Sequence, residues 1–346
     1  MSFENLPTEV VVENAQEPLR DGGDFRPRRW LAGGHRMTLA GNFLPRKNLL
    51  AAPEERLFAV EPGVQVLCHC HWQQDRGQPA TLIVLHGLEG SSNSQYVIGT
   101  ANKAFAAGMN VVRMNMRNCG GTEKLTPTLY HSGLSADVAA VANTLIEEDK
   151  LTGIVLAGYS MGGNLVLKCA GDWGAKAPQQ LRAVCAISPA FDLAPSADAL
   201  HKPANWIYEQ KFLLGLMRRF RRKAELFPER YTTTGLKRMR SVREFDEFIT
   251  APHSGFTGAD DYYHRAAAAR VIDRIQVPTL IVYAQDDPFI RILPESRAKI
   301  TANPHIQFIE TEHGGHCAFL AEPNGYDGYW AERKIIEFVK AVLGTQ

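Results

Sequence analysis

Short apolar segments recur along most of the chain and alternate with longer stretches that look helical, such as Ser135–Glu148. Most of the apolar segments are bounded by Gly, Pro or Asn. Strands that alternate with helices predict an α/β fold, in which a mainly parallel sheet is covered by helices on both faces. The predicted strands of this sheet are Thr81–Leu85, Met109–Met114, Gly153–Ala157, Ala183–Ile187, Thr279–Tyr283 and Ile306–Ile309.

Two parts of the chain depart from this rhythm. Val64–Trp72 partly alternates and is predicted to pair with Arg56–Val60 across a Pro-Gly turn. Between Ser188 and about Arg274 helical stretches occur without a strong strand signal, which indicates a helical insertion. The expected organisation is an N-terminal arm (1–55), a first part of the core (56–190), a helical cap (191–273) and a second part of the core (274–346).

Composition narrows the class of protein. Apolar residues make up 45% and charged residues 22% of the 346 residues, which is ordinary for a globular protein with a large core. The net charge of +1 gives no global reason to expect nucleic acid as a partner. The start of the chain does not resemble a signal peptide, and no apolar run is long enough for an integral membrane segment. The 6 cysteines are scattered along the chain, which argues against a disulfide scaffold. A cytoplasmic protein with reduced thiols is expected, and its oligomeric state stays open.

The segment Gly158–Gly163, Gly-Tyr-Ser-Met-Gly-Gly, joins a predicted strand to a helical stretch. A serine on such a sharp turn projects its Oγ from the carboxyl edge of the sheet, and the flanking glycines leave room for the strained backbone. The following helix directs backbone N–H groups toward the reaction centre. We therefore expect Ser160 to be a nucleophile. The plain alternative is a tight turn with an incidental serine.

A serine nucleophile needs a base that is held by a third group, in the chain order serine, acid, histidine. Asp286 and Asp287 follow one predicted strand, and His313 and His316 follow the last one. Asp287 is favoured because the Asp-Pro-Phe-Ile phrase that it begins resembles one common after the catalytic acid, and Asp286 is then expected to cap the next turn. His316 is favoured because two glycines precede it, and His313 is then a structural loop residue.

Backbone donors for a developing oxyanion are expected from two loops. One donor is the N–H of Met161, the residue after the nucleophile, and the other is the N–H of Leu88, in the loop after the strand that ends at Leu85. His86 begins this loop and is expected to support it rather than to act as a base.

Three other features are discounted. The tract Cys68–His71 has the right residue types for a metal, but alternation along a strand turns its cysteines and histidines to opposite sides. Cys119 follows a strand at the active edge and carries no mark of a nucleophile. The basic run Arg218–Lys223 is expected to be a solvated face, the alternative being a patch that meets anionic head groups or an acyl-CoA. No metal site is predicted, because His313 and His316 lack further ligands.

Several phrases together resemble the YheT-type esterases, the AB hydrolase 4 family, from about Phe25 to the C-terminus. That resemblance implies an α/β-hydrolase fold with a helical cap and a Ser-Asp-His triad, which falls on Ser160, Asp287 and His316. Where relatives often read Phe-Arg-Gly-Cys-Gly-Gly, this chain reads Asn115–Gly121, a change in a pocket loop that leaves the triad in place. The phrases are Leu85–Ser91, Tyr130–Gly133, Gly158–Asn164, Asp286–Phe289 and His313–His316, and the resemblance includes the arm segment Thr38–Arg46 and the insertion phrase Val242–Asp246.

The expected function is that of a serine hydrolase that cleaves short- to medium-chain carboxylic esters through an acyl-enzyme, without a metal or an organic cofactor. Its partner would be a small ester or a lipid-like substrate. Relatives in the resembled family include acyl-CoA:alcohol acyltransferases, so acyl transfer with the same triad is the first alternative. A binding protein on a hydrolase scaffold is the second.

Overall fold

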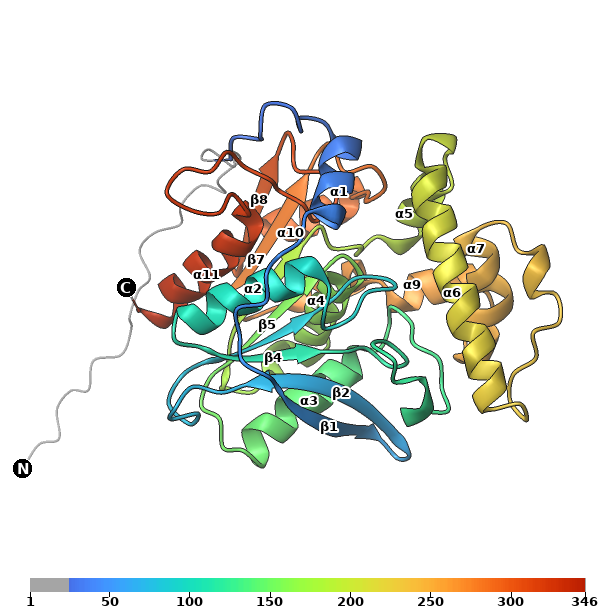
Figure 1. Ribbon diagram of the computed structural model, residues 1–346, viewed down its shortest axis with the longest axis horizontal. Coiled ribbons are helices and arrows are strands. Elements are labelled where there is room, and N and C mark those ends of the chain that lie inside the picture. Colours follow the sequence, from blue (N-terminus) through green and yellow to red (C-terminus); the bar gives the residue numbers. More distant parts are fainter. Residues whose placement is uncertain (1–24, 346) are drawn as a thin grey trace, which may run out of the picture.

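The structure is a computed structural model that describes residues 25–345, and its centre is an eight-stranded sheet (Figure 1). The strand order is β1-β2-β4-β3-β5-β6-β7-β8; the strands from β3 to β8 are parallel, whereas β2 is antiparallel to β1 and β4. The predicted α/β class with a mainly parallel sheet is confirmed. The strands are β1 Glu54–Glu61, β2 Val64–His71, β3 Thr81–Leu85, β4 Asn110–Met114, β5 Ile154–Tyr159, β6 Leu181–Ile187, β7 Thr279–Ala284 and β8 Ile306–Thr311.

Helices cover both faces of the sheet, and this explains why its central strands are continuous apolar runs. Every residue of β3, β4, β5 and β7 is buried. On one face α2 and α11 pack on the sheet and on each other, and on the other face α3, α4 and α10 pack. These helices are α2 Gln95–Ala106, α3 Ser135–Glu147, α4 Met161–Trp173, α10 Pro294–Ala302 and α11 Trp330–Leu343.

The chain between β6 and β7 forms a helical cap, which lies to one side of the sheet (Figure 1, right). Its described residues contain no strand, as the sequence pattern predicted. No helix within residues 25–345 is long and apolar enough to cross a membrane. The cap helices are α5 Leu193–Leu200, α6 Trp206–Leu226, α7 Val242–Phe245, α8 Ala251–His253 and α9 Ala259–Ala266.

The predicted arm contains a helix that the sequence pattern did not reveal. Residues 1–24 of the arm lie outside the described residues, but α1 spans Gly34–Phe43. Its contacts are very close: a Cβ on Gly34 would lie 1.7 Å from the carbonyl oxygen of Asp286, and a Cβ on Gly41 would lie 2.5 Å from the Cβ of Ala318. Small residues therefore let α1 pack directly on the loops that follow β7 and β8.

Candidate active site

Ser160 lies on the turn between β5 and α4 with φ 54° and ψ −117°, a strained conformation for a residue with a side chain. Its N–H donates to the carbonyl oxygen of Ile187 at 2.9 Å. A Cβ on Gly158 would lie 2.2 Å from the carbonyl oxygen of Gly162, and one on Gly162 would lie 2.4 Å from that of His86. The two glycines are therefore what allows the chain to turn this sharply.

The loops after β7 and β8 form two histidine–aspartate pairs. Nδ1 of His316 lies 2.8 Å from Oδ2 of Asp287, and Nδ1 of His313 lies 3.2 Å from Oδ2 of Asp286. The Asp287 side chain is fully buried, whereas 18% of the Asp286 side chain is exposed. His316 lines the same cavity as Ser160, and His313 does not line it. The pair of His316 and Asp287 therefore has the arrangement of a base and its orienting acid.

Both oxygens of Asp287 are held in place. Its Oδ1 accepts hydrogen bonds from the backbone N–H groups of Phe289 at 3.1 Å and Ile290 at 2.9 Å, which leaves Oδ2 for the imidazole. The Phe289 ring packs against the imidazole of His316 with 4.3 Å between ring centroids. These contacts fix the plane of the ring, so the direction of its Nε2 is fixed as well.

The expectation that Asp286 caps the next turn is wrong, because Asp287 takes that role. Instead, Oδ1 of Asp286 accepts from the N–H of Gly315 at 2.8 Å and so holds the loop that carries His316. Sequence reasoning also missed Thr38 of α1, whose Oγ1 accepts from the N–H of His316 at 2.8 Å. The available signal was the family resemblance of the segment around Thr38, since nothing in the local pattern marks that residue.

The protonation of His316 is set by opposing effects. Burial lowers the pKa of His316, whereas the adjacent Cys317 side chain and the Asp287 carboxylate raise it, and the net pKa lies above the ordinary value of 6.5. At neutral pH the imidazolium form is therefore favoured more than in a free histidine.

The loop after β3 lies against the nucleophile, since a Cβ on Gly87 would be 3.1 Å from the Cβ of Ser160. The N–H of Gly87 donates to the hydroxyl of Tyr96 at 2.9 Å, which fixes the loop. In the part of the chain that the structure describes, the N–H groups of Leu88 and Met161 donate to no protein acceptor. Two such donors in the loop against Ser160 and directly after Ser160 suit an oxyanion.

The surroundings of His86 and Cys119 argue against a catalytic role for either residue. Nδ1 of His86 lies 2.7 Å from the carbonyl oxygen of Gly87, and its Nε2 accepts from the N–H of Met116 at 3.2 Å. Burial lowers the pKa of His86 to about 4, so the ring is neutral. Burial raises the pKa of the Cys119 thiol to about 12, so that sulfur is not an activated nucleophile.

The tract Cys68–His71 alternates as predicted. Cys68 and Cys70 point into the main hydrophobic core, while His71 contacts the guanidinium of Arg113 at 3.3 Å on the opposite face. Among residues 25–345, no group of three or more His, Cys, Asp or Glu side chains could hold a metal ion.

The basic run on α6 is a solvated face only in part: Arg218 and Arg222 are exposed, whereas Arg219 and Lys223 turn toward the core. Nε of Arg219 lies 3.1 Å from Oε1 of Glu89, and the buried Nζ of Lys223 donates to Oδ1 of Asn118 at 2.6 Å and to the carbonyl oxygen of Glu123 at 2.7 Å. Burial lowers the pKa of Lys223 to about 8. These two cations attach the cap helix to the loops that follow β3 and β4, and helical periodicity alone could not show that they face inward.

Two cavities meet at Ser160, and both are also lined by Leu88, Phe212 and Phe289. The first, the cap cavity, has a volume of about 110 Å³ and lies between the core and the cap. The second, the α1 cavity, has a volume of about 320 Å³ and lies between α1, α6 and the His316 loop. The cap cavity has apolar walls that include Leu193, Leu200, Leu216 and Val242.

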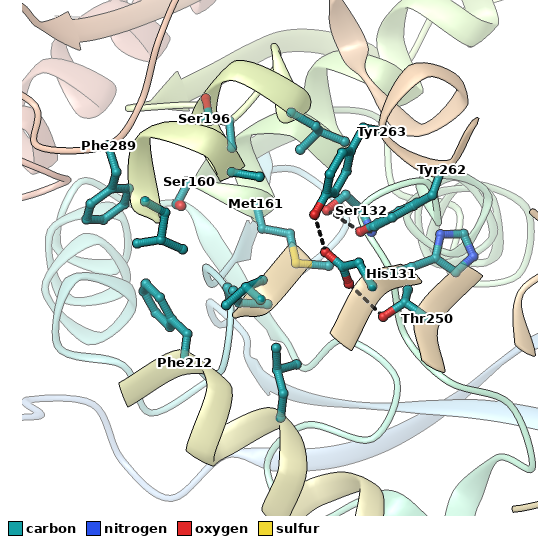
Figure 2. Close-up of a pocket in the computed structure, with 18 of the residues that line it drawn as sticks. His131, Ser132, Ser160, Met161, Ser196, Phe212, Thr250, Tyr262, Tyr263 and Phe289 are labelled. Atoms are coloured by element: carbon teal, nitrogen blue, oxygen red, sulfur yellow. Dashed lines mark hydrogen bonds between the residues drawn. The ribbon is translucent and has the colours of Figure 1, made fainter. Parts of the chain in front are cut away.

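A polar cluster forms the far side of the cap cavity, opposite Ser160 (Figure 2). The hydroxyl groups of Tyr263 and Thr250 donate to the carboxylate of Asp246 at 2.8 Å and 2.7 Å, and Tyr262 donates to Ser132 at 2.9 Å. Burial raises the pKa of Asp246 to about 6. Because both Asp246 oxygens have partners, this cluster closes the cavity without demanding a further ligand.

Comparison with known proteins finds relatives that are named as esterases. The "Putative esterase YheT" of Escherichia coli is 29% identical over 343 residues, which cover 97% of this chain and 98% of that protein. The "Medium-chain fatty acid ethyl ester synthase/esterase 2" of Saccharomyces cerevisiae is 27% identical over 74% of this chain and 61% of its own length. The resemblance to the YheT-type esterases is thereby confirmed.

Solved structures support the same fold. The chain superposes on Est1E from Butyrivibrio proteoclasticus with a TM-score of 0.54 at 16% identity, over 85% of this chain and all (100%) of that one. A family model described as the alpha/beta hydrolase fold matches residues 80–323, which include the Ser160, Asp287 and His316 positions. The chain belongs to the alpha/beta hydrolase fold family.

Proposed function

We propose that this protein is a serine hydrolase that cleaves short- to medium-chain carboxylic esters, with Ser160 as nucleophile, His316 as base and Asp287 as orienting acid. One observation carries the proposal: a strained serine between strand and helix shares a cavity wall with a histidine whose Nδ1 is bonded to a buried carboxylate. The full-length similarity to an esterase-named relative supports the same chemistry.

The proposed reaction proceeds through an acyl-enzyme. His316 takes the Ser160 proton as Oγ attacks the ester carbonyl carbon, and the N–H groups of Leu88 and Met161 receive the developing oxyanion. When the intermediate collapses, the ester C–O bond breaks and the imidazolium gives its proton to the leaving alcohol. Water then attacks the acyl-enzyme with His316 as base, which releases the acid and restores Ser160. No metal or cofactor enters this scheme.

The two cavities suggest where the two halves of the ester bind. The apolar walls of the cap cavity suit the acyl chain, and the α1 cavity, which contains His316, suits the alcohol that leaves or the water that enters. The polar cluster around Asp246 limits the length of an acyl chain, because apolar carbons placed there would gain no apolar contact. The cap, about 191–273, would thus set specificity.

A series of p-nitrophenyl esters from acetate to palmitate tests the proposal. We expect hydrolysis with the highest kcat/KM at a short or medium chain and a steep fall for palmitate, because the cap cavity is small and closed by polar groups. The absence of hydrolysis for every ester would overturn the function, and an optimum at palmitate would overturn the cavity assignment.

The same assay separates hydrolysis from acyl transfer. The yeast relative's name gives both synthase and esterase activities, and the α1 cavity has room for an alcohol. With ethanol added, ethyl ester among the products would show that an alcohol competes with water for the acyl-enzyme.

A pH profile tests the role of His316. Because the protonated imidazole cannot accept the Ser160 proton, kcat/KM is expected to fall as pH decreases through the pKa of His316, which lies above 6.5. Cys317→Ala removes a group that raises this pKa, so the acid limb is expected to move to lower pH.

The matched control is Cys119→Ala, which removes another buried thiol, one that has no part in the His316 pKa. Its acid limb is expected to coincide with that of the unmodified protein. A limb midpoint at or below 6.5 in the unmodified protein would contradict this account of His316.

A further inference from the structure

Large apolar side chains are exposed on α1 and α6, the two helices that flank the α1 cavity. On α1, Leu39 is 38% exposed and Phe43 is 75% exposed. On α6, Trp206, Ile207 and Leu214 are 62%, 63% and 56% exposed. These five residues are called the apolar rim. Exposed apolar side chains of this size, gathered on two neighbouring helices, are typical of an interaction surface rather than of ordinary solvent exposure.

The rim is one surface, although its two helices are far apart in sequence. Nζ of Lys211 on α6 donates to Oδ1 of Asn42 on α1 at 2.9 Å, so the helices lie side by side there. Leu39, Phe43 and Ile207 all line the α1 cavity. Leu214 follows Ile207 by seven residues and therefore lies on the same stripe of α6, two turns further along.

The two helices that carry the rim have a positive net charge. Helix α1 contains no acidic residue, and between Trp206 and Leu226 the acidic residues are Glu209 and Glu225. Glu209 is buried and bonded to His201, and Glu225 lies at the far end of the helix. The exposed cations Lys211 and Arg218 alternate with the apolar residues of the stripe. The net charge of +1 for the whole chain therefore hides a local cationic and apolar surface.

We propose that the apolar rim docks on the surface of an anionic lipid bilayer. Helices that present Trp and Leu beside Lys and Arg bind in the plane of a bilayer interface, where apolar side chains enter the acyl boundary and cations meet anionic head groups. A second protein would need complementary acidic and apolar groups, whereas the bilayer supplies both over a broad surface. This pose turns the mouth of the α1 cavity toward the lipid.

The consequence for substrate entry rests on the proposed function, but the docking itself does not. An ester dissolved in the bilayer would pass from the lipid through the α1 cavity to Ser160 without crossing water. Binding and hydrolysis are therefore measured separately, so that failure of one is distinguishable from failure of the other.

The test is co-sedimentation of the full chain with vesicles of phosphatidylcholine alone or with added phosphatidylglycerol. We expect binding that is stronger with phosphatidylglycerol and weakened by salt. The variant Trp206→Ser/Leu214→Ser should bind the vesicles at least about tenfold more weakly, because two apolar side chains no longer enter the interface. Arg218→Glu should lose mainly the preference for phosphatidylglycerol.

Leu57→Ser is the matched control, since Leu57 is 50% exposed on β1 at the edge of the sheet, away from the α1 cavity. It should bind vesicles as the unmodified chain does. Trp206 and Leu214 line neither cavity, so hydrolysis of dissolved p-nitrophenyl acetate should be unchanged in their variant.

Three results would overturn the docking proposal. One is no binding to either kind of vesicle, and another is equal binding by the Trp206→Ser/Leu214→Ser variant. The third is self-association in solution, measured by analytical ultracentrifugation, that this variant abolishes while vesicles bind nothing. That outcome would assign the rim to a second copy of the chain.

Discussion

Replacing Ser160 by alanine is expected to lower kcat for a p-nitrophenyl ester by about 10⁴- to 10⁶-fold, because the acyl-enzyme can no longer form. The fold should persist, since the turn is held by backbone hydrogen bonds and by the glycines on either side rather than by the Ser160 hydroxyl. The measurements are steady-state kinetics, a thermal melt, and labelling by a fluorophosphonate probe, which the variant should not show.

A serine of the same neighbourhood provides the control. Ser94 lines the α1 cavity, and its Oγ accepts a hydrogen bond from the N–H of Ser91 at 3.1 Å. Ser94→Ala should keep kcat within about tenfold of the unmodified protein and retain probe labelling, because the Ser94 hydroxyl stabilises the loop that contains Ser91. If Ser160→Ala remained fully active, or if the probe labelled another serine, the nucleophile would have to be sought elsewhere.

The sequence predicted the sheet well because the sheet is buried on both faces. Strands such as β3 and β7 are apolar at every position or nearly so, and have a proline within the two residues before them and a polar residue directly after them, so their places can be read locally. The turn at Ser160 was equally local, since the requirement for Gly158 and Gly162 follows from backbone packing within a few residues. Local patterns therefore sufficed for the sheet and the serine turn.

The supporting contacts could not be predicted, because they join distant parts of the chain. Thr38 and His316 are separated by 278 residues, and the helix that carries Thr38 has two glycines and no side-chain cap at its start. The inward direction of Arg219 and Lys223 likewise depends on where the loops of the core lie. Residue types indicated which side chains carry the chemistry, whereas only the tertiary structure shows which contacts hold those side chains in position.

The two adjacent aspartates give the sharpest test of the site, because each pairs with a different histidine. Asp287→Asn keeps the shape of the side chain but removes the charge that orients His316 and stabilises its imidazolium, so kcat/KM should fall by about 10⁴-fold. Asp286→Asn should cost about tenfold or less, because the amide oxygen can still accept from the N–H of Gly315. Both variants should fold, since each retains its shape and an acceptor atom.

The comparison is made on one ester at a pH well above the acid limb, where His316 is neutral in the unmodified protein. Removing the Asp287 charge also removes a group that raises the pKa of His316, so the residual activity of Asp287→Asn should persist to lower pH than that of Asp286→Asn. The two variants therefore show which histidine–aspartate pair acts in catalysis. A larger loss of activity in Asp286→Asn would mean that the His313 pair, and not the His316 pair, activates the nucleophile. Equal losses would mean that both carboxylates act only by holding the loop.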